Sequence, residues 1–175
     1  MLHAFFPIGE IVKPQGIRGE VKVLPDTSYP QHMAKLAVVY HKNGENYAPI
    51  NVEKARVQDG CLYYQLEGID DRNKAESWRG VILFVDRAHH VPLEEGENYI
   101  GDLEGCKVVT EDGTSVGTLE SIIHPAAQDL YTVKTADEKH LVFPSVPGLI
   151  LNADPANDLI MVSAKTLSEV SLLED

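Results

Sequence analysis

Short segments of alternating apolar and polar residues, separated by glycine and aspartate turns, make up most of the first half of the chain. A period of two is typical of half-buried strands, and short apolar runs that end at turn residues are typical of buried ones. Asp59-Gly60 separates two such segments and predicts a β-hairpin. We expect strands at 19–24, 36–41, 51–57, 61–66 and 81–85.

One internal segment, 71–78, instead predicts a helix, with Asp70 or Asp71 as its N-cap and Gly80 as its stop. The second half returns to short strands, and residues 165–173 predict a terminal helix with Leu167, Val170 and Leu173 on one face. The strands expected there lie at 104–110, 115–123, 129–135, 140–143, 149–151 and 159–163. The chain is therefore predicted to be all-β, with two small barrels or sandwiches in series and few short helices.

Charge is divided unevenly between the two halves. Residues 1–92 carry 11 Lys and Arg against 11 Asp and Glu, whereas residues 93–175 carry 4 against 16, so the whole net charge of -12 lies in the second half. This asymmetry favours two modules with different partners: a neutral one that can approach a phosphate backbone and an acidic one that attracts a basic protein. The acidity is equally compatible with a role in solubility alone.

The composition, 43% hydrophobic and 24% charged with a mean hydropathy of -0.16, is ordinary for a globular protein. No apolar run approaches the ~18 residues of a membrane span, and residues 1–7 lack the basic region of a signal peptide, so we expect a cytoplasmic protein. Cys61 and Cys106 form no CxxC unit, and no histidine has metal-ligand spacing. We expect no metal, no cofactor and no catalytic residues, and therefore no enzyme.

Segment 8–23 is the clearest candidate binding site. It predicts a strand–loop–strand unit in which glycines alternate with the cations Lys13, Arg18 and Lys22. A glycine-rich loop with flanking cations can contact phosphate oxygens through backbone N–H groups and side chains. The alternative is a tight connection in a small barrel whose charges are merely exposed. In the second half, Tyr99 and Leu103 beside a turn could anchor a protein interface or close the mouth of the second barrel.

Four motifs together resemble the RimM family of bacterial ribosome maturation factors, and their order and spacing cover nearly the whole chain. They are Gly9–Val23 with its core Pro14–Val21, then Gly68–Glu76 ending in Trp78-Arg79-Gly80, then Tyr99–Leu103 followed by Gly105, and finally Gly117-Thr118 through Gln128–Leu130 to Phe143-Pro144.

The resemblance implies a six-stranded barrel like those of translation factors at 1–88, a linker at 89–98 and a PRC-type β-barrel at 99–175. It also implies a factor that binds the immature small (30S) subunit and ribosomal protein uS19. Such a factor promotes maturation of the subunit head and 16S rRNA processing without cutting RNA. Apart from the resemblance, we expect a monomer. Two other classes remain open: an RNA-processing enzyme and a PRC-barrel regulatory adaptor.

By position, the resemblance assigns RNA or subunit contact to the N-terminal signature and ribosomal-protein contact to the segment after the linker. Asn98 departs from the aromatic residue common there, which places more weight on Tyr99. Gln15 stands where the family commonly has histidine, so no ionisable role is assigned to it. The RNA-binding candidates are Lys13, Gly16, Arg18, Gly19 and Lys22, and the protein-binding candidates are Asn98, Tyr99, Asp102 and Leu103.

Overall fold

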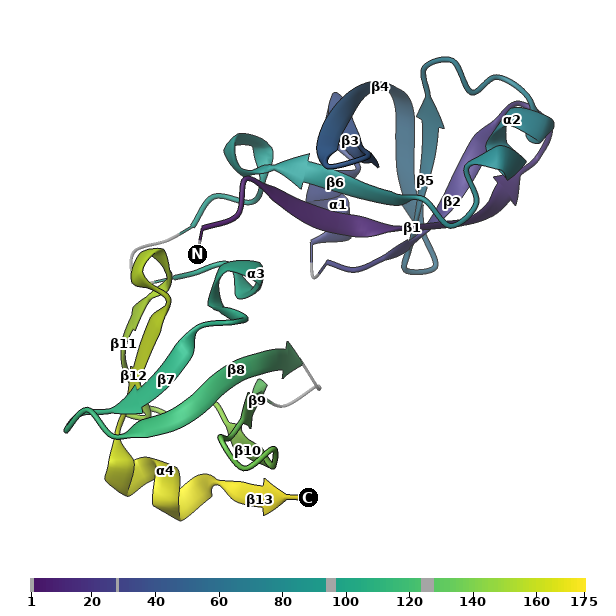
Figure 1. Ribbon diagram of the computed structural model, residues 1–175. Helices are drawn as coiled ribbons and strands as arrows, with labels where there is room; N and C mark the ends of the chain where they lie inside the picture. The colour runs from purple at the N-terminus through teal and green to yellow at the C-terminus, as the bar shows by residue number, and fades with distance from the viewer. Residues whose placement is uncertain (1, 28, 94–96, 124–127) are drawn as a thin grey trace. The chain divides into compact units, whose positions relative to one another are not determined.

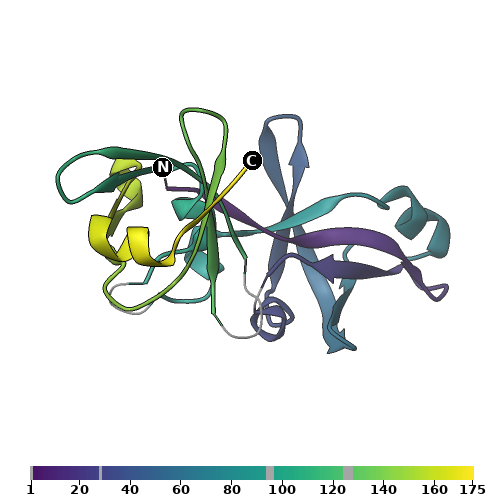
Figure 2. The same ribbon diagram turned by 90° about the horizontal axis from the view of Figure 1, so that it is seen from below.

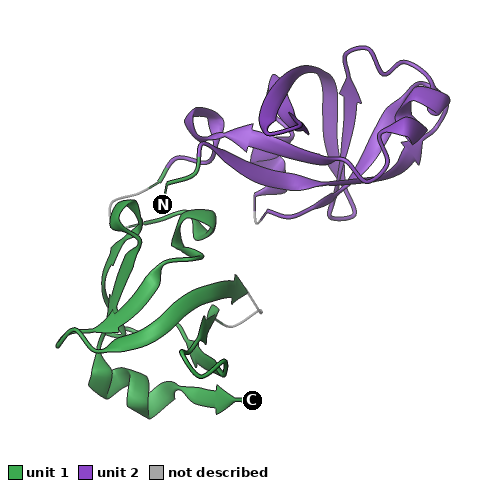
Figure 3. Ribbon diagram, in the orientation of Figure 1, with its two compact units in different colours: residues 1–3, 93–175 green, residues 4–92 purple. Residues whose placement is uncertain are grey.

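A computed structural model describes residues 2–27, 29–93, 97–123 and 128–175 (Figure 1). The chain divides into two compact units, residues 4–92 and residues 93–175 together with 1–3 (Figure 3). The domain limits expected from the resemblance stay a prediction, and residues 94–96 of the expected linker lie outside the described part. Among the described residues, no helix has the length and apolarity to cross a bilayer.

Residues 4–92 form a closed barrel with the strand order β1-β2-β5-β4-β3-β6, in which every neighbouring pair is antiparallel. The inward-facing side chains of the strands form a core that includes Ile8, Val21, Leu62 and Leu83. β2 buries alternate residues, as expected for a half-buried strand, whereas β5 buries three residues in succession. The elements are β1 (Phe5–Gln15), β2 (Glu20–Pro25), α1 (Pro30–Met33), β3 (Val38–Asn43), β4 (Asn46–Gln58), β5 (Cys61–Leu66), α2 (Arg72–Ser77), β6 (Ile82–Asp86) and the 3-10 turn η1 (Arg87–His89).

Tyr64 is the largest fully buried side chain among the described residues, and its hydroxyl donates a 2.7 Å hydrogen bond to the carbonyl of Met33 at the end of α1. Burial raises the pKa of this phenol far above its ordinary value, so Tyr64 stays neutral and keeps its donor. The bond ties α1 to the core of the barrel.

Residues 93–175 form a seven-stranded sheet with the order β11-β12-β7-β8-β9-β10-β13, in which only the β12–β7 pair is parallel. A separate core includes Val108, Leu119, Val133, Phe143 and Leu149. The elements are α3 (Ile100–Leu103), β7 (Lys107–Thr110), β8 (Ser115–Ile123), β9 (Leu130–Lys134), β10 (His140–Pro144), β11 (Ile150–Asp154), the 3-10 turn η2 (Pro155–Asn157), β12 (Leu159–Val162), α4 (Ala164–Val170) and β13 (Leu172–Glu174).

The predicted all-β class is confirmed, and so is the hairpin at Asp59-Gly60, where both turn residues have positive φ. The prediction of a terminal helix at 165–173 is wrong in its last turn. α4 ends at Val170, Ser171 is extended, and Leu173 lies in β13 opposite Leu141 of β10. Pairing with an available sheet edge overrides the helical spacing of the leucines.

Candidate functional site

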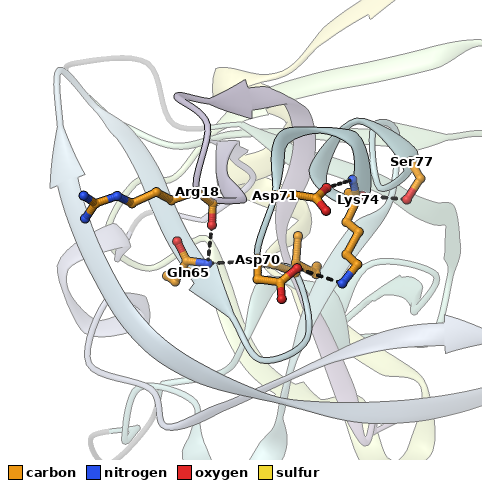
Figure 4. Close-up of polar contacts among 7 residues, drawn as sticks. Arg18, Gln65, Asp70, Asp71, Lys74 and Ser77 are labelled. Atoms are coloured by element: carbon orange, nitrogen blue, oxygen red, sulfur yellow. Dashed lines mark hydrogen bonds and ion pairs between the residues drawn. The ribbon is translucent and has the colours of Figure 1, made fainter.

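The connection between β1 and β2 is held by side chains that come from distant parts of the sequence. The Nε2 atom of Gln65 donates to the carbonyls of Arg18 (3.0 Å) and Ile69 (2.7 Å) (Figure 4). Arg72 Nη1 donates to the carbonyl of Gly16 (3.0 Å). These bonds join the β1–β2 turn to β5 and to the first residue of α2, and Figures 1 and 2 show α2 beside this turn. The first two motifs of the sequence therefore form one structural unit.

Gly19 is required by this packing. Its φ is +90°, and a Cβ atom there would lie 2.2 Å from the carbonyl oxygen of Ile69. Gly16 also has a positive φ, +74°, but a Cβ atom there would meet nothing within 4 Å. Gly19 thus allows the turn to approach the neighbouring backbone, whereas Gly16 only supplies a left-handed conformation.

Lys74 of α2 and Arg79, which follows the helix, are paired with nearby carboxylates. Asp71 caps the helix by accepting a 2.7 Å hydrogen bond from the backbone N–H of Lys74, as predicted for this N-cap. Lys74 Nζ lies 2.7 Å from Asp70 Oδ1, and this hydrogen bond lowers the pKa of the Asp70 carboxyl and raises that of the Lys74 ammonium. Arg79 is paired with Glu76 in the same way.

Strand register places Lys13, Lys22, Tyr63 and Arg56 in one row on the outer face of β1, β2, β5 and β4. Their strand neighbours Val21 and Tyr64 are fully buried, which fixes this row on the outside. We call these four residues the outer row. Lys13 and Lys22 are direct cross-strand partners, an arrangement of like charges that destabilises a sheet.

At the other end of the outer row, Arg56 covers the ring of Tyr63, with its guanidinium carbon 4.1 Å from the ring centroid. Arg56 Nη2 also lies 2.8 Å from Glu20 Oε1, and the hydrogen bond to Glu20 raises the pKa of the guanidinium. Tyr63 is only 8% exposed because the arginine lies over it. Glu20 thus neutralises the cation at this end of the outer row.

All five RNA-binding candidates lie at this end of the barrel. Lys13, Gly16 and Arg18 are exposed, Lys22 is half-buried and Gly19 is buried. Within the described part of the chain, Lys13, Arg18 and Lys22 form no ion pair, and the Arg18 side chain extends away from Gln65 and Asp71 (Figure 4). The structure therefore gathers three uncompensated cations around one turn.

Three residues of this surface, Arg56, Tyr63 and Arg72, were missing from the sequence-based candidates. Arg56 and Tyr63 could have been paired from the sequence, because counting outward from the two-residue turn at Asp59-Gly60 places them opposite each other. No local pattern indicates the bond between Arg72 and Gly16, which are 56 residues apart.

The four candidates of the second unit are close together but differ in burial. Asn98 and Tyr99 are half-buried, and the carbonyl of Tyr99 accepts the N–H groups of Asp102 (3.0 Å) and Leu103 (3.3 Å) as α3 begins. Asp102 is 2% exposed and accepts a 2.8 Å bond from the backbone N–H of His3, and Leu103 belongs to the core. The structure gives Asp102 and Leu103 a role in shaping the turn, and it leaves their side chains little surface with which to contact a partner directly.

No cluster of three or more histidine, cysteine or acidic side chains that could hold a metal ion occurs in the described ranges. Cys106 is buried, which raises the pKa of its thiol, and its Sγ lies 3.4 Å from the carbonyl oxygen of Asp102. A buried thiol kept protonated in this way is a packing residue and a poor nucleophile.

Two family models match the chain: the RimM N-terminal domain over residues 6–90 and the PRC-barrel domain over residues 95–167. The ribosome maturation factor RimM of Caldanaerobacter subterraneus is 34% identical over 160 residues, which are 90% of this chain and 95% of the relative. The corresponding factor of Oceanobacillus iheyensis is 33% identical over 157 residues, 90% of this chain and 92% of the relative.

Two solved structures are also similar to the chain. One is a putative 16S ribosomal RNA processing protein RimM from Pseudomonas aeruginosa, with a TM-score of 0.46 and 25% identity over 91% of this chain and 96% of that one. The other is the N-terminal domain of RimM from Thermus thermophilus, with a TM-score of 0.43 and 24% identity over 53% of this chain and all of that one.

Proposed function

Because this chain belongs to the RimM family of ribosome maturation factors, we propose that it binds the immature 30S subunit and promotes maturation of the subunit head and processing of 16S rRNA without catalysis. In this proposal the barrel contacts rRNA, and the acidic unit binds ribosomal protein uS19. The observation that carries the proposal is the group of three cations around the β1–β2 turn that have no ion pair with any described residue.

The turn suits a phosphate backbone because it is both cationic and rigid. Arg18 and Lys22 each supply a charge that no carboxylate of the described ranges neutralises, and Lys13 stands opposite Lys22. Anion binding would relieve the repulsion between these two lysines, since a phosphate oxygen between them interacts favourably with both. The bonds from Gln65 and Arg72 hold the turn in one conformation before the RNA arrives, which lowers the entropy cost of binding.

The second unit suits a basic protein because sixteen carboxyl residues and four lysines follow residue 92. Most of those carboxylates cannot have a lysine partner within the unit, so their field attracts a cationic surface. Tyr99 contributes a half-buried aromatic ring beside α3, and an aromatic side chain supplies large contact area at low entropy cost.

A non-catalytic factor can drive maturation through binding alone. A protein that binds only the folded form of an RNA element stabilises that form by RT ln(1+[L]/Kd), about 2.7 kcal/mol when the free factor is at ~100 times its Kd. This shift is enough to redistribute assembly intermediates between folded and unfolded head conformations.

The direct test is to purify the tagged full chain from cells and ask which subunits come with it. We expect immature small subunits containing precursor 16S rRNA, with fewer mature subunits. Arg18→Glu should lower the recovery of immature subunits, whereas Lys35→Glu, which reverses an exposed lysine that follows α1, should not. Equal recovery with both variants would refute the role of the turn, and cleavage of precursor RNA by the pure protein would refute the non-catalytic role.

A further inference from the structure

A groove runs along the outer face of β1 at the end of the strand away from the outer row. It encloses about 510 Å³ between β1, β2 and β6. The groove is lined by residues that include Pro7, Glu10, Leu24, Asp26, Ile82 and Phe84.

The floor of the groove combines two exposed aliphatic side chains with one carboxylate. Leu24 is 57% exposed and Ile82 is 46% exposed, so both offer apolar surface to a ligand. Glu10 of β1 is the direct cross-strand partner of both, Leu24 on one side and Ile82 on the other. Since neighbouring strands lie about 4.8 Å apart, Glu10 and the two apolar residues that flank it on β2 and β6 lie within reach of a single ligand residue.

The groove is acidic as well as apolar. Glu10 and Asp26 are both exposed, and neither forms an ion pair with the residues that the structure describes. The backbone N–H of Asp26 donates a 2.7 Å bond to the carbonyl of Ile8, which fixes the chain at the rim of the groove. The outer face of β1 therefore changes from acidic at Glu10 to basic at Lys13, so one strand carries two surfaces of opposite charge.

We propose that this groove binds an extended protein segment in which arginine is flanked by aliphatic residues. An arginine side chain can pack its methylene stem on Leu24 and Ile82 while its guanidinium makes a bidentate contact with Glu10. An RNA backbone is excluded because Glu10 and Asp26 would repel its phosphates. Strand addition is excluded at Glu10 as well, because β1 is paired there with β2 on one side and with β6 on the other, so recognition must come from side chains.

This site is separate from the proposed RNA surface and from the proposed uS19 surface of the second unit. A test of peptide binding at this groove therefore does not depend on whether either of those two proposed surfaces binds its partner. A factor with such a groove would hold a cationic protein segment on the same barrel that contacts rRNA.

The test uses the full chain and a short fluorescent peptide in which arginine alternates with valine, with binding followed by fluorescence anisotropy. A peptide with glutamine in place of arginine serves as the uncharged probe. We expect Glu10→Gln to weaken binding of the arginine peptide about tenfold and Leu24→Ser to weaken it several-fold. Two matched controls, Glu53→Gln on β4 and Leu151→Ser on β11, alter equally exposed side chains elsewhere and should leave the affinity unchanged.

Three results would overturn the inference. Equal affinity of Glu10→Gln and Glu53→Gln would show that the peptide binds the acidic second unit through its overall charge. Equal binding of the glutamine and arginine peptides would remove the role of the carboxylates. A dimer of the parent chain in sedimentation velocity that Leu24→Ser converts to a monomer would assign the groove to a second copy of the chain.

Discussion

In residues 4–92 every strand of the barrel has two neighbours, whereas residues 93–175 form a sheet in which β11 and β13 are edges. The two units also differ in their charge balance. The barrel balances its acids and bases overall and leaves three cations at one turn without an ion pair to any described residue, while the second unit has four lysines for sixteen acids. Net charge therefore predicts the kind of partner for the second unit better than for the first, whose proposed binding surface is local.

The largest expected effect separates the folding of the two units. Gly19→Ala should destabilise the barrel by about 3 kcal/mol, because a Cβ atom at 2.2 Å from the Ile69 carbonyl forces the backbone apart at a strained φ. Gly16→Ala should cost only about 1 kcal/mol, since the same left-handed strain arises without the clash. Trp78, the single tryptophan of the chain, lies in the barrel and reports its unfolding by fluorescence in a urea titration.

Hydrogen exchange of the β7 amides provides the control for that experiment, because β7 belongs to the second unit. Its protection should be the same in the parent and in Gly19→Ala. Loss of β7 protection in the variant would show that the two units unfold together, and equal stability of the two glycine variants would contradict the close approach at Gly19.

The next effect concerns RNA affinity at the β1–β2 turn. The double variant Arg18→Glu and Lys22→Glu should weaken binding to head-region 16S RNA by roughly tenfold or more at moderate salt. The slope of log K against log salt should flatten by about 1 for each phosphate that the variant no longer neutralises. A slope equal to that of the parent would exclude these two side chains as phosphate ligands, and Lys35→Glu provides a control for a single charge reversal elsewhere on the barrel.

Protein affinity in the second unit should depend on Tyr99. Tyr99→Ala should weaken binding to purified uS19 by about tenfold, since truncating an interface tyrosine removes a large contact area. Tyr29→Ala, which removes an exposed tyrosine of the barrel, should leave that affinity unchanged. Surface plasmon resonance measures both, and equal Kd values for Tyr99→Ala and the parent would exclude Tyr99 from the interface.

Lys22→Glu should change RNA affinity and barrel stability in opposite directions. Lys22→Glu removes the like-charge pair with Lys13 and should stabilise the barrel by about 0.5 kcal/mol while it weakens RNA binding. The urea midpoint followed by Trp78 fluorescence gives the stability. A lower midpoint than that of the parent would mean that the two lysines do not repel each other in the folded barrel.

Local patterns in the sequence predicted the features that depend on residues close together in the chain. The Asp59-Gly60 hairpin and the capped helix at 71–78 are of this kind, because turn residues and N-caps act over two to four positions. The terminal helix failed at Leu173, where a sheet edge contributed by residues 140–142 was available. Nothing near Leu173 in the sequence reports that edge.

The candidate sites follow the same division. The cations of residues 13–22 were found from sequence because they lie within ten positions of one another. The outer row also depends on the register shift of β1 between Ile11 and Lys13, which only the paired strands define. The burial of Asp102 depends on the backbone N–H of His3, 99 residues away, so a sequence pattern reads this aspartate as a surface residue.

The smallest predicted effect is a pH dependence confined to the second unit. Asp112 accepts hydrogen bonds from the hydroxyl of Thr110 and the backbone N–H of Thr114, and these bonds lower the pKa of its carboxyl to about 2. A depressed pKa stabilises the folded state above the unfolded value of about 4, and this contribution disappears as the pH falls through about 2. Asp112→Asn should therefore flatten the pH dependence of unfolding of this unit between about pH 4 and 2, measured by β7 hydrogen exchange, without altering that of the barrel. An unchanged profile in the second unit would mean that the Thr110–Asp112 turn opens before the unit unfolds in acid. Any difference in the pH dependence of unfolding between the two units would then come from the other carboxylates.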